Sequence, residues 1–171
     1  MNDIRRLTAD ELLASAEEFG SLLVDTVDSG ASVGFLAPLD HAAATAWWTA
    51  VAPGVAAGGT VVWAARVDGR IAGTVQIRFE DKENGRHRAE VVKLLVHRDA
   101  RGRGLGRELL AVAERGAVEA GVRLLLLDTV TGSPADSLYR SAGWTPFGTV
   151  PGYAADTKGV PEPTTFFYKA V

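Results

Sequence analysis

The stretch VVKLLVHRDARGRGLGRELL, residues 91–110, joins an apolar run to an amphipathic run through a segment rich in glycine and arginine. The apolar run, Val91 to Val96, is typical of a buried strand, and leucines at helical spacing follow the segment. Small residues before a helix leave backbone N–H groups unobstructed, and the helix N-terminus adds a partial positive charge. The stretch therefore predicts a strand, a loop suited to a diphosphate, and a helix.

The spacing of the glycines excludes two common nucleotide-binding loops. A dinucleotide fingerprint needs G-x-G-x-x-G, but the sixth position is Arg107 when counted from Gly102 and Leu109 when counted from Gly104. A P-loop needs a glycine followed by lysine and then serine or threonine, and no glycine of this segment is followed in that way. Taken alone, the segment is also compatible with a glycine-rich turn that carries solvated arginines.

Length and composition are those of a soluble globular protein, and we expect one domain over residues 1–171. The net charge of −3 argues against a nucleic-acid partner, since general nucleic-acid binders carry a basic excess. The absence of cysteine excludes disulfides, thiolate metal sites and a cysteine nucleophile. The histidines lie far apart at His41, His87 and His97, so no metal is expected.

The chain has no apolar run near the roughly 20 residues that a membrane span needs. Its first residues also lack the basic and then apolar pattern of a secretory signal. We therefore expect no membrane partner and a cytoplasmic location.

Helical and extended patterns alternate along the rest of the chain. Thr8 and Glu11 form a capping box before the first helix, Asp40 starts the second, and Pro53 is expected to end it. Asp68–Gly69 marks a hairpin. We expect helices over 8–27, 40–52, 105–120 and 133–142, and strands over 60–67, 70–80, 89–97, 122–130, 144–150 and 164–171, with a loop over 151–163. This order predicts an α/β domain with a mixed sheet.

Arg101, Gly104 and Gly106 match the signature [QR]-x-x-G-x-[GA] between a strand and a helix. The stretch thereby resembles the acetyl-CoA-binding core of the GNAT superfamily of N-acetyltransferases. Further along, LLLLDTV and ADSLYRSAGW are similar to the family's later strand, its tyrosine-bearing helix and its final strands. The resemblance implies an α/β (α+β) fold with a mixed, mostly antiparallel sheet of about six to seven strands and about four helices. More narrowly, LDTVTGS and VPGYAAD look like the tabtoxin-resistance type.

The resemblance implies a binding site for acetyl-CoA on this unit. Backbone groups of the strand would contact the pantetheine arm and the thioester carbonyl, and the loop amides would hold the pyrophosphate, with added contacts from two arginine side chains. Many family members have an asparagine seven residues before the tyrosine. That position is Gly132 here, and the next residue, Ser133, either replaces the contact or caps the following helix. The implied cofactor residues are Leu94, Leu95, Val96, Arg101, Gly102, Arg103, Gly104, Leu105, Gly106, Arg107 and Ser133.

The resemblance also implies three catalytic side chains. Tyr139 would protonate the departing thiolate, or it packs its helix on the sheet. Glu90 and Asp128 border apolar runs, where a carboxylate can have a raised pKa and act as a base. Glu90 could instead pair with Arg88 or with an arginine on the neighbouring strand, and Asp128 could cap a turn.

The acceptor pocket would lie between the two loops that usually set substrate choice in this family. Phe35, Trp48 and Tyr153 are the predicted substrate-binding residues. Trp47, the neighbour of Trp48 on the same predicted helix, could also line the pocket. Adjacent helical residues lie about 100° apart, so one of the two tryptophans should pack into the core.

These inferences predict an acetyl-CoA-dependent N-acetyltransferase that acts on a small-molecule amine, such as an antibiotic or an amino-acid-like toxin. The amine would attack directly in a ternary complex. The alternatives are an acetyltransferase for protein lysine or N-terminal amines, and a non-catalytic acyl-CoA-binding sensor. A homodimer is compatible with the resemblance, because dimers are common in the family.

Overall fold

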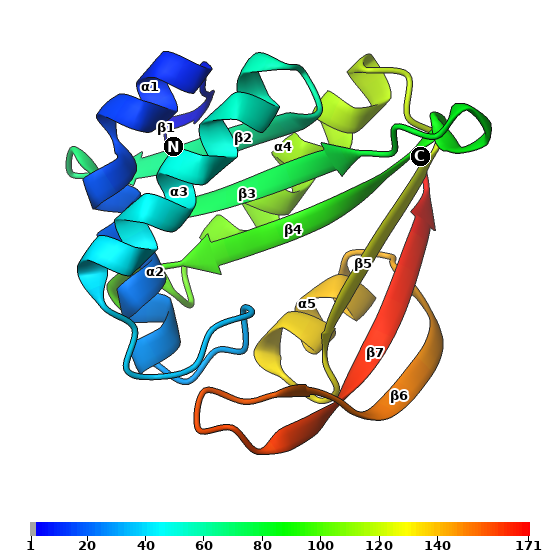
Figure 1. Ribbon diagram of the computed structural model, residues 1–171. Coiled ribbons are helices and arrows are strands. Elements are labelled where there is room, and N and C mark those ends of the chain that lie inside the picture. The colour runs from blue at the N-terminus through cyan, green and yellow to red at the C-terminus, as the bar shows by residue number, and fades with distance from the viewer. Residues whose placement is uncertain (1–2) are drawn as a thin grey trace.

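The computed structural model describes residues 3–171, which form a seven-stranded sheet with helices on both faces (Figure 1). The strand order is β1-β2-β3-β4-β5-β7-β6, in which β4 and β5 are parallel and the other neighbouring strands are antiparallel. The strands are β1 (Asp3–Arg6), β2 (Thr60–Val67), β3 (Arg70–Phe79), β4 (Arg88–Val96), β5 (Leu124–Val130), β6 (Thr145–Ala155) and β7 (Pro161–Ala170).

The described residues form five α-helices and two short 3-10 turns. The helices are α1 (Ala9–Ala14), α2 (Ala16–Asp28), α3 (His41–Ala56), α4 (Leu105–Glu119) and α5 (Pro134–Ser141), and the turns are η1 (Glu83–Gly85) and η2 (Arg98–Ala100). The predicted capping box is present at α1. The Thr8 hydroxyl accepts from the Glu11 N–H at 3.2 Å, and the Glu11 carboxylate accepts from the Thr8 N–H at 2.7 Å.

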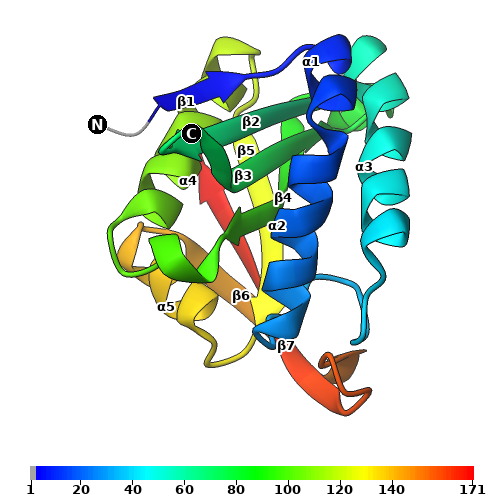
Figure 2. The same ribbon diagram turned by 90° about the vertical axis from the view of Figure 1, so that its left-hand side faces the viewer.

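Two apolar clusters lie on opposite faces of the sheet. Helices α1, α2 and α3 cover one face of β2 to β4, and α4 covers the other (Figure 2). Phe19 and Trp48 lie fully buried on the first face, and Leu109 and Phe167 on the second. Because the sheet separates the two clusters, side chains of one strand alternate between them.

The structure confirms the predicted mixed α/β fold, but several boundaries differ. Strand β1 was not predicted, since its four residues are mostly exposed and show no apolar alternation. The first predicted helix is two helices that meet at Ser15. Pro53 does not end the second predicted helix, because it lies in the last turn of α3, where one lost hydrogen bond is tolerated.

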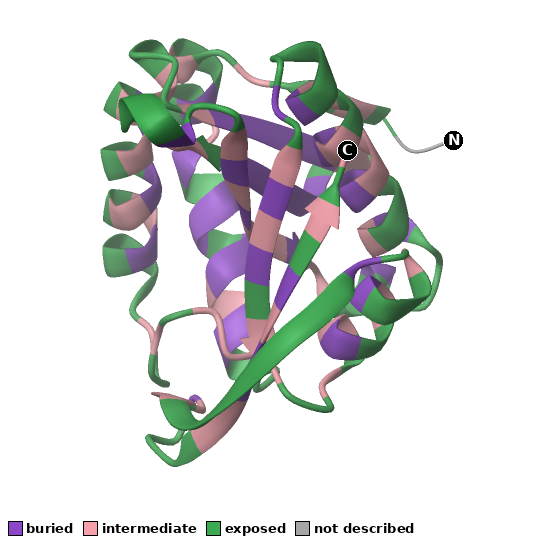
Figure 3. Ribbon diagram, turned by 90° about the vertical axis from the view of Figure 1, so that its right-hand side faces the viewer, coloured by how far each residue is buried: buried purple, intermediate pink, exposed green. Residues whose placement is uncertain are grey.

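The last two strands are also longer than expected. Strand β6 continues to Ala155 and β7 begins at Pro161, so residues 156–160 connect them in place of the predicted loop over 151–163. Strand β6 is the edge of the sheet and is exposed along nearly its whole length (Figure 3). An edge strand accommodates proline because its outward N–H has no partner in the ladder, and β6 contains Pro146 and Pro151.

Candidate active site

The sheet opens between β4 and β5. Their parallel pairing joins Arg88–Glu90 to Leu124–Leu126, and the two strands then diverge (Figure 1). Beyond this point β4 still pairs with β3, but its other edge has no strand partner within residues 3–171. The backbone groups that Leu94–Val96 direct toward β5 are therefore available to a ligand, apart from the Val96 carbonyl, which accepts from Arg101.

The glycine loop leads from β4 into the N-terminus of α4. Gly102 and Gly104 have φ of +75° and +84°, in the left-handed region that favours glycine. The Glu108 N–H donates to the Gly104 carbonyl at 3.1 Å, so the N–H groups of residues 105–107, in the first turn of α4, lack intrahelical acceptors. Those of residues 102–104 also find no acceptor in the described part of the chain. Such a row of free amides at a helix N-terminus suits a phosphate group.

Two of the loop's arginine side chains anchor the loop to the end of α2. Arg98 forms an ion pair with Asp25, and its backbone N–H donates to the same carboxylate at 2.9 Å. Arg101 donates to the Val96 carbonyl at 2.9 Å and to the Ser29 hydroxyl at 2.8 Å. These two side chains fix the loop, and the Arg101 N–H itself donates to the Arg98 carbonyl at 3.3 Å.

Of the other two arginines, one is hydrogen-bonded to α5 and one is not hydrogen-bonded to the described residues. Arg107 donates to the Ser141 hydroxyl at 2.5 Å, which ties α4 to the end of α5. Arg103 makes no hydrogen bond or ion pair with residues 3–171 and is exposed. Of the predicted phosphate ligands, Arg103 is therefore the side chain that is free to bind an anion.

Glu90 lies where β4 and β5 begin to separate. It forms an ion pair with Arg78, its partner on β3, in agreement with the alternative of a pair with an arginine on the neighbouring strand. Glu90 is also in register with Leu126 on β5, and Asp128 follows two residues later on the same face. The structure thus brings both predicted carboxylates to one face of the opening.

Asp128 is exposed at the opening and makes no hydrogen bond or ion pair with the described residues. Partial desolvation by the surrounding protein raises the pKa of its carboxyl, and the negative charge of Glu90 raises it further, whereas the charges of Lys93 and Arg78 act in the opposite direction. An unpaired carboxyl with a raised pKa is a good proton acceptor near neutral pH.

Tyr139 lies on α5 and packs against Trp144 and Phe167, with ring centroids 6.0 and 5.9 Å away. Burial raises the pKa of its hydroxyl, and the charge of Asp128 adds to this. The hydroxyl therefore keeps its proton at neutral pH. The packing role and the proton-donor role that the sequence left open are compatible with this position.

Ser133 caps helix α5. Its hydroxyl accepts from the Asp136 N–H at 3.2 Å, as one of the two sequence-based alternatives proposed. The Asp136 carboxylate accepts from the Gly132 N–H at 2.7 Å and pairs with Arg140. The turn before α5 is therefore held by the helix's own side chains.

The two neighbouring tryptophans separate as expected, but in the order opposite to the prediction. Trp48 is fully buried, with its ring centroid 4.5 Å from that of Phe19, so its proposed contact with substrate is wrong. Trp47 faces the opening instead and meets Phe35 edge to face at 5.7 Å. Trp48 is buried because it lies on the side of α3 that packs against α2.

Tyr153 is exposed and stacks edge to face on Phe166 at 5.0 Å. Phe166 pairs with Asp128 across β5 and β7, so both side chains lie on the same face. The loop that carries Phe35 meets the β6–β7 hairpin nearby, where the Ala37 N–H donates to the Thr157 carbonyl at 2.8 Å. Aromatic residues from two distant segments therefore border the carboxylates.

Sequence reasoning missed Lys93, whose ammonium lies 5.2 Å from the Trp47 ring centroid and 5.9 Å from that of Phe35. The signal was present, because Lys93 is the one charged residue in the apolar run over 91–96. Arg78, the partner of Glu90, was likewise not identified by number.

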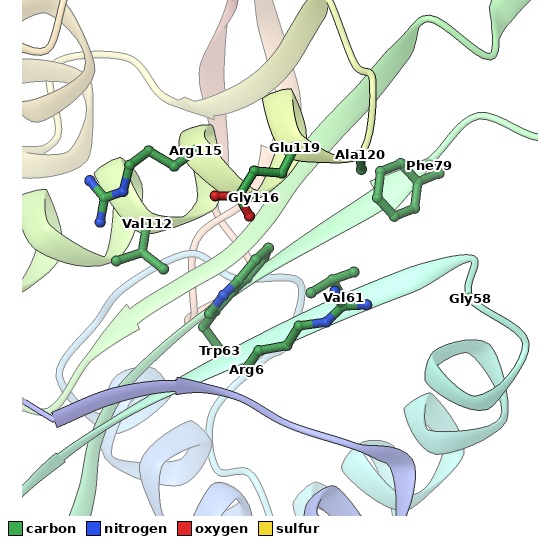
Figure 4. A pocket seen from close by; sticks show the side chains of 10 residues that line it. All are labelled: Arg6, Gly58, Val61, Trp63, Phe79, Val112, Arg115, Gly116, Glu119 and Ala120. Carbon is green, nitrogen blue, oxygen red and sulfur yellow. The ribbon is translucent and has the colours of Figure 1, made fainter.

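A cavity of about 620 Å³ lies elsewhere, between α4 and the β1–β3 region (Figure 4). None of the predicted site residues lines it. Its lining residues are Arg6, Gly58, Val61, Trp63, Phe79, Val112, Arg115, Gly116, Glu119 and Ala120. Within residues 3–171, no three metal-ligating side chains gather into a site, and no helix is long and apolar enough to cross a membrane.

The model of the Acetyltransferase (GNAT) family matches residues 17–144, which include the glycine loop, both carboxylates and Tyr139. The chain belongs to the GNAT family of acetyltransferases. The family and the acetyltransferase activity predicted from the sequence are thereby confirmed.

Solved structures share the fold of this acetyltransferase over nearly its whole length. The ribosomal-protein-alanine N-acetyltransferase from Brucella melitensis is 25% identical, with 99% of each chain covered and a TM-score of 0.75. The putative acetyltransferase yncA from Salmonella typhimurium, solved with its cofactor acetyl-CoA, is 20% identical, with 99% of this chain and 94% of that chain covered and a TM-score of 0.79. An N-acetyltransferase from Staphylococcus aureus Mu50 is 16% identical, with 99% and 98% covered and a TM-score of 0.80.

Proposed function

We propose that this acetyltransferase transfers the acetyl group of acetyl-CoA to the amine of a small molecule, in the manner of the tabtoxin-resistance type. Acetyl-CoA supplies an activated acetyl thioester, whose carbonyl carbon an amine can attack. The fit to a CoA pyrophosphate is supported by the free amides of residues 102–107 and by the unpaired guanidinium of Arg103. The related fold of the Salmonella protein with acetyl-CoA supports the same assignment.

The open edge of β4 complements the glycine loop. Leu94–Val96 direct backbone groups into the opening, where amides of an extended ligand can pair with them as a further strand does. A backbone N–H placed toward a thioester oxygen stabilises the negative charge that develops there during acyl transfer, an effect of roughly 3 kcal/mol for one donor.

Asp128 is the proposed general base. An amine arrives protonated at neutral pH and must lose a proton before it attacks. Asp128 is unpaired and has a raised pKa, whereas Glu90 is held by Arg78. Glu90 then acts through its charge, which increases the basicity of Asp128 and attracts the ammonium.

Tyr139 is the proposed general acid. Its hydroxyl stays protonated because burial raises its pKa, so a proton is available for the thiolate that leaves. Asp128 and Tyr139 interact electrostatically, and the raised pKa of Tyr139 partly reflects the charge of Asp128. In this proposal Asp128 accepts a proton from the amine and Tyr139 donates one to the thiolate.

The observation that carries the choice of a small acceptor is the contact between the two specificity loops. The Ala37 N–H donates to the Thr157 carbonyl at 2.8 Å, and the Ser32 hydroxyl donates to the Ala155 carbonyl at 3.2 Å. These bonds tie the α2–α3 loop to the β6–β7 hairpin beside Phe35. A site that is enclosed by these two segments and lined by aromatic side chains favours a compact molecule over a folded protein.

A protein N-terminal amine is the second candidate acceptor. The Brucella relative is named for the acetylation of a ribosomal-protein alanine, and an unfolded N-terminus could enter the same opening. A single domain over residues 1–171, a cytoplasmic location and a homodimer stay predictions.

A screen for acceptors tests the proposal. Release of free thiol from acetyl-CoA is measured with a panel of small amines and with peptides that begin with alanine. We expect turnover with small amines. Turnover with the peptides alone would favour the protein acceptor, and tight binding of acetyl-CoA without turnover on any amine would favour the sensor.

A further inference from the structure

Strand β4 contains a β-bulge beside the opening. The pairing with β3 leaves two residues, Lys93 and Leu94, opposite the single residue Val75. Lys93 adopts φ of +53°, a conformation that residues other than glycine seldom take. Bulges often occur next to active sites, where they redirect a side chain.

The bulge places Lys93 on the face of the sheet that carries Asp128. In an unbroken strand, Lys93 would share the α4 face with Val91. Instead Leu94 packs on the α4 face and Leu95 joins the cluster under α2 and α3, so the alternation is shifted by one residue. The shift adds one side chain to the acceptor face, and that side chain is Lys93.

The Lys93 ammonium is held among aromatic rings and has no ion pair or hydrogen bond with residues 3–171. It lies over Trp47 and Phe35, which attract a cation through their ring faces. Burial lowers its pKa, and the charge of Arg78 contributes, while Asp128 favours the charged form. Because the rings use none of its three N–H donors, these remain available to oxygen atoms of a ligand.

The charges on this face form a bipolar site. Glu90 and Arg78 are partners in an ion pair. Asp128 and Lys93 are then the unpaired anion and cation that face the opening. A ligand with both an amine and a carboxylate complements this arrangement, whereas a simple alkylamine satisfies Asp128 alone.

We propose that Lys93 is a specificity-determining residue that binds a carboxylate of the acceptor, so that the amine acetylated is that of an amino acid or an amino-acid-like compound. This inference rests on the proposed function, because it assumes that the amine faces Asp128. Phe35 and Trp47 position the ammonium, and its free N–H groups donate to the carboxylate oxygens.

The test compares acceptors with and without a carboxylate. The kcat and KM are measured with acetyl-CoA for a panel of amino acids, each paired with its α-amide and with the amine that lacks the carboxyl group. Rates are referred to the deprotonated amine at each pH, since the paired compounds differ in amine pKa. We expect kcat/KM to be about tenfold or more higher for the acids, as a charge-assisted hydrogen bond predicts.

Variants of Lys93 identify the residue responsible. Lys93→Met keeps most of the length of the side chain and should raise KM for the acids by about 10- to 100-fold, and the change in KM for the neutral acceptors should be much smaller. Lys93→Arg should keep the preference for acids. Lys82→Met is the matched control, since Lys82 is an exposed lysine beside η1, and its kinetics should equal those of the wild type.

The outcomes separate this inference from the function on which it rests. Equal turnover of acids and neutral partners would overturn the role of Lys93 and leave the small-amine function standing. A fall in kcat for both kinds of acceptor in Lys93→Met and Lys93→Arg, with KM unchanged, would assign Lys93 to proton transfer and also overturn the proposal. Acetylation of no compound in the panel would overturn both.

Discussion

The two halves of the candidate active site are built in different ways. The donor half comes from one continuous stretch, residues 94–107, and consists mainly of backbone amides. The acceptor half consists of side chains from α3, β4, β5, β6 and the α2–α3 loop, which are far apart in the sequence. A site made of backbone is specified by glycine positions and a helix start, whereas a site made of side chains depends on how distant elements pack. The same fold can therefore keep its donor half while the acceptor half varies.

Among the variants considered, we expect the largest change in stability when one of the adjacent tryptophans of α3 is replaced. Trp48→Ala removes a fully buried ring packed on Phe19 and should lower the free energy of unfolding by about 3–5 kcal/mol. Trp47→Ala should lower it by less than about 1.5 kcal/mol, because Trp47 is partly exposed, and should raise KM for the acceptor. Urea denaturation and steady-state kinetics measure both. A greater loss of stability in Trp47→Ala would contradict the exchange of roles found here.

Replacing the proposed base tests the chemistry of the acceptor half. Asp128→Asn should lower kcat by about 100-fold or more, because it removes the proposed proton acceptor while Glu90 is held by Arg78. Since burial penalises the charged carboxyl, the neutral amide should leave the thermal midpoint unchanged or higher.

The pH dependence of the wild type follows from the same group. The pKa of Asp128 is raised, and the protonated carboxyl cannot accept a proton, so activity should fall as pH drops through that pKa. The pH–rate profile of Asp128→Asn should lose this acidic limb. A profile identical to that of the wild type would remove Asp128 from the mechanism.

Gly104 tests the donor half. An added Cβ at Gly104 meets no atom within 4 Å, so Gly104→Ala should cost about 1–2 kcal/mol through backbone strain at positive φ. The methyl group stands in the loop where a phosphate would approach, so Kd for acetyl-CoA should rise about tenfold or more. Gly121→Ala is the matched control, because Gly121 has the same backbone region and the same open space at the other end of α4. Calorimetric titration should show the loss of affinity in the first variant alone.

The loop arginines give the smallest expected effect. Arg103→Ala should raise Kd for acetyl-CoA about five- to tenfold, as the loss of one exposed charged contact predicts, with stability unchanged. Arg98→Ala should instead lower stability by about 1–3 kcal/mol, because it removes the guanidinium that pairs with the mostly buried carboxylate of Asp25. Equal loss of acetyl-CoA affinity in both variants would contradict the division between anchoring and binding arginines.

The sequence was most informative where structure depends on neighbouring residues. The strand, glycine loop and helix over 91–110 could be predicted because each signal is local. The bulge at Lys93 could not, since it depends on the register with β3 and is not marked by glycine. Strand β6 was predicted too short because Pro151 and Gly152 indicate a turn, and only the position of β6 at the sheet edge makes them acceptable.

The acceptor half was only partly predictable, because it depends on packing between distant segments. Phe35 and Tyr153 were identified from two expected loops, although Tyr153 lies in β6. The choice between Trp47 and Trp48 required the orientation of α3 against α2. Lys93 was overlooked because its strand pattern placed it on the other face. Positions that break a local pattern were therefore those that the sequence described least well.

The end of helix α2 links the two halves mechanically. Asp25 holds Arg98, Ser29 holds Arg101 at 2.8 Å, and the chain then runs directly into the segment that carries Phe35. The glycine loop of the donor half and the segment that begins the acceptor half are therefore fixed to the same helix end.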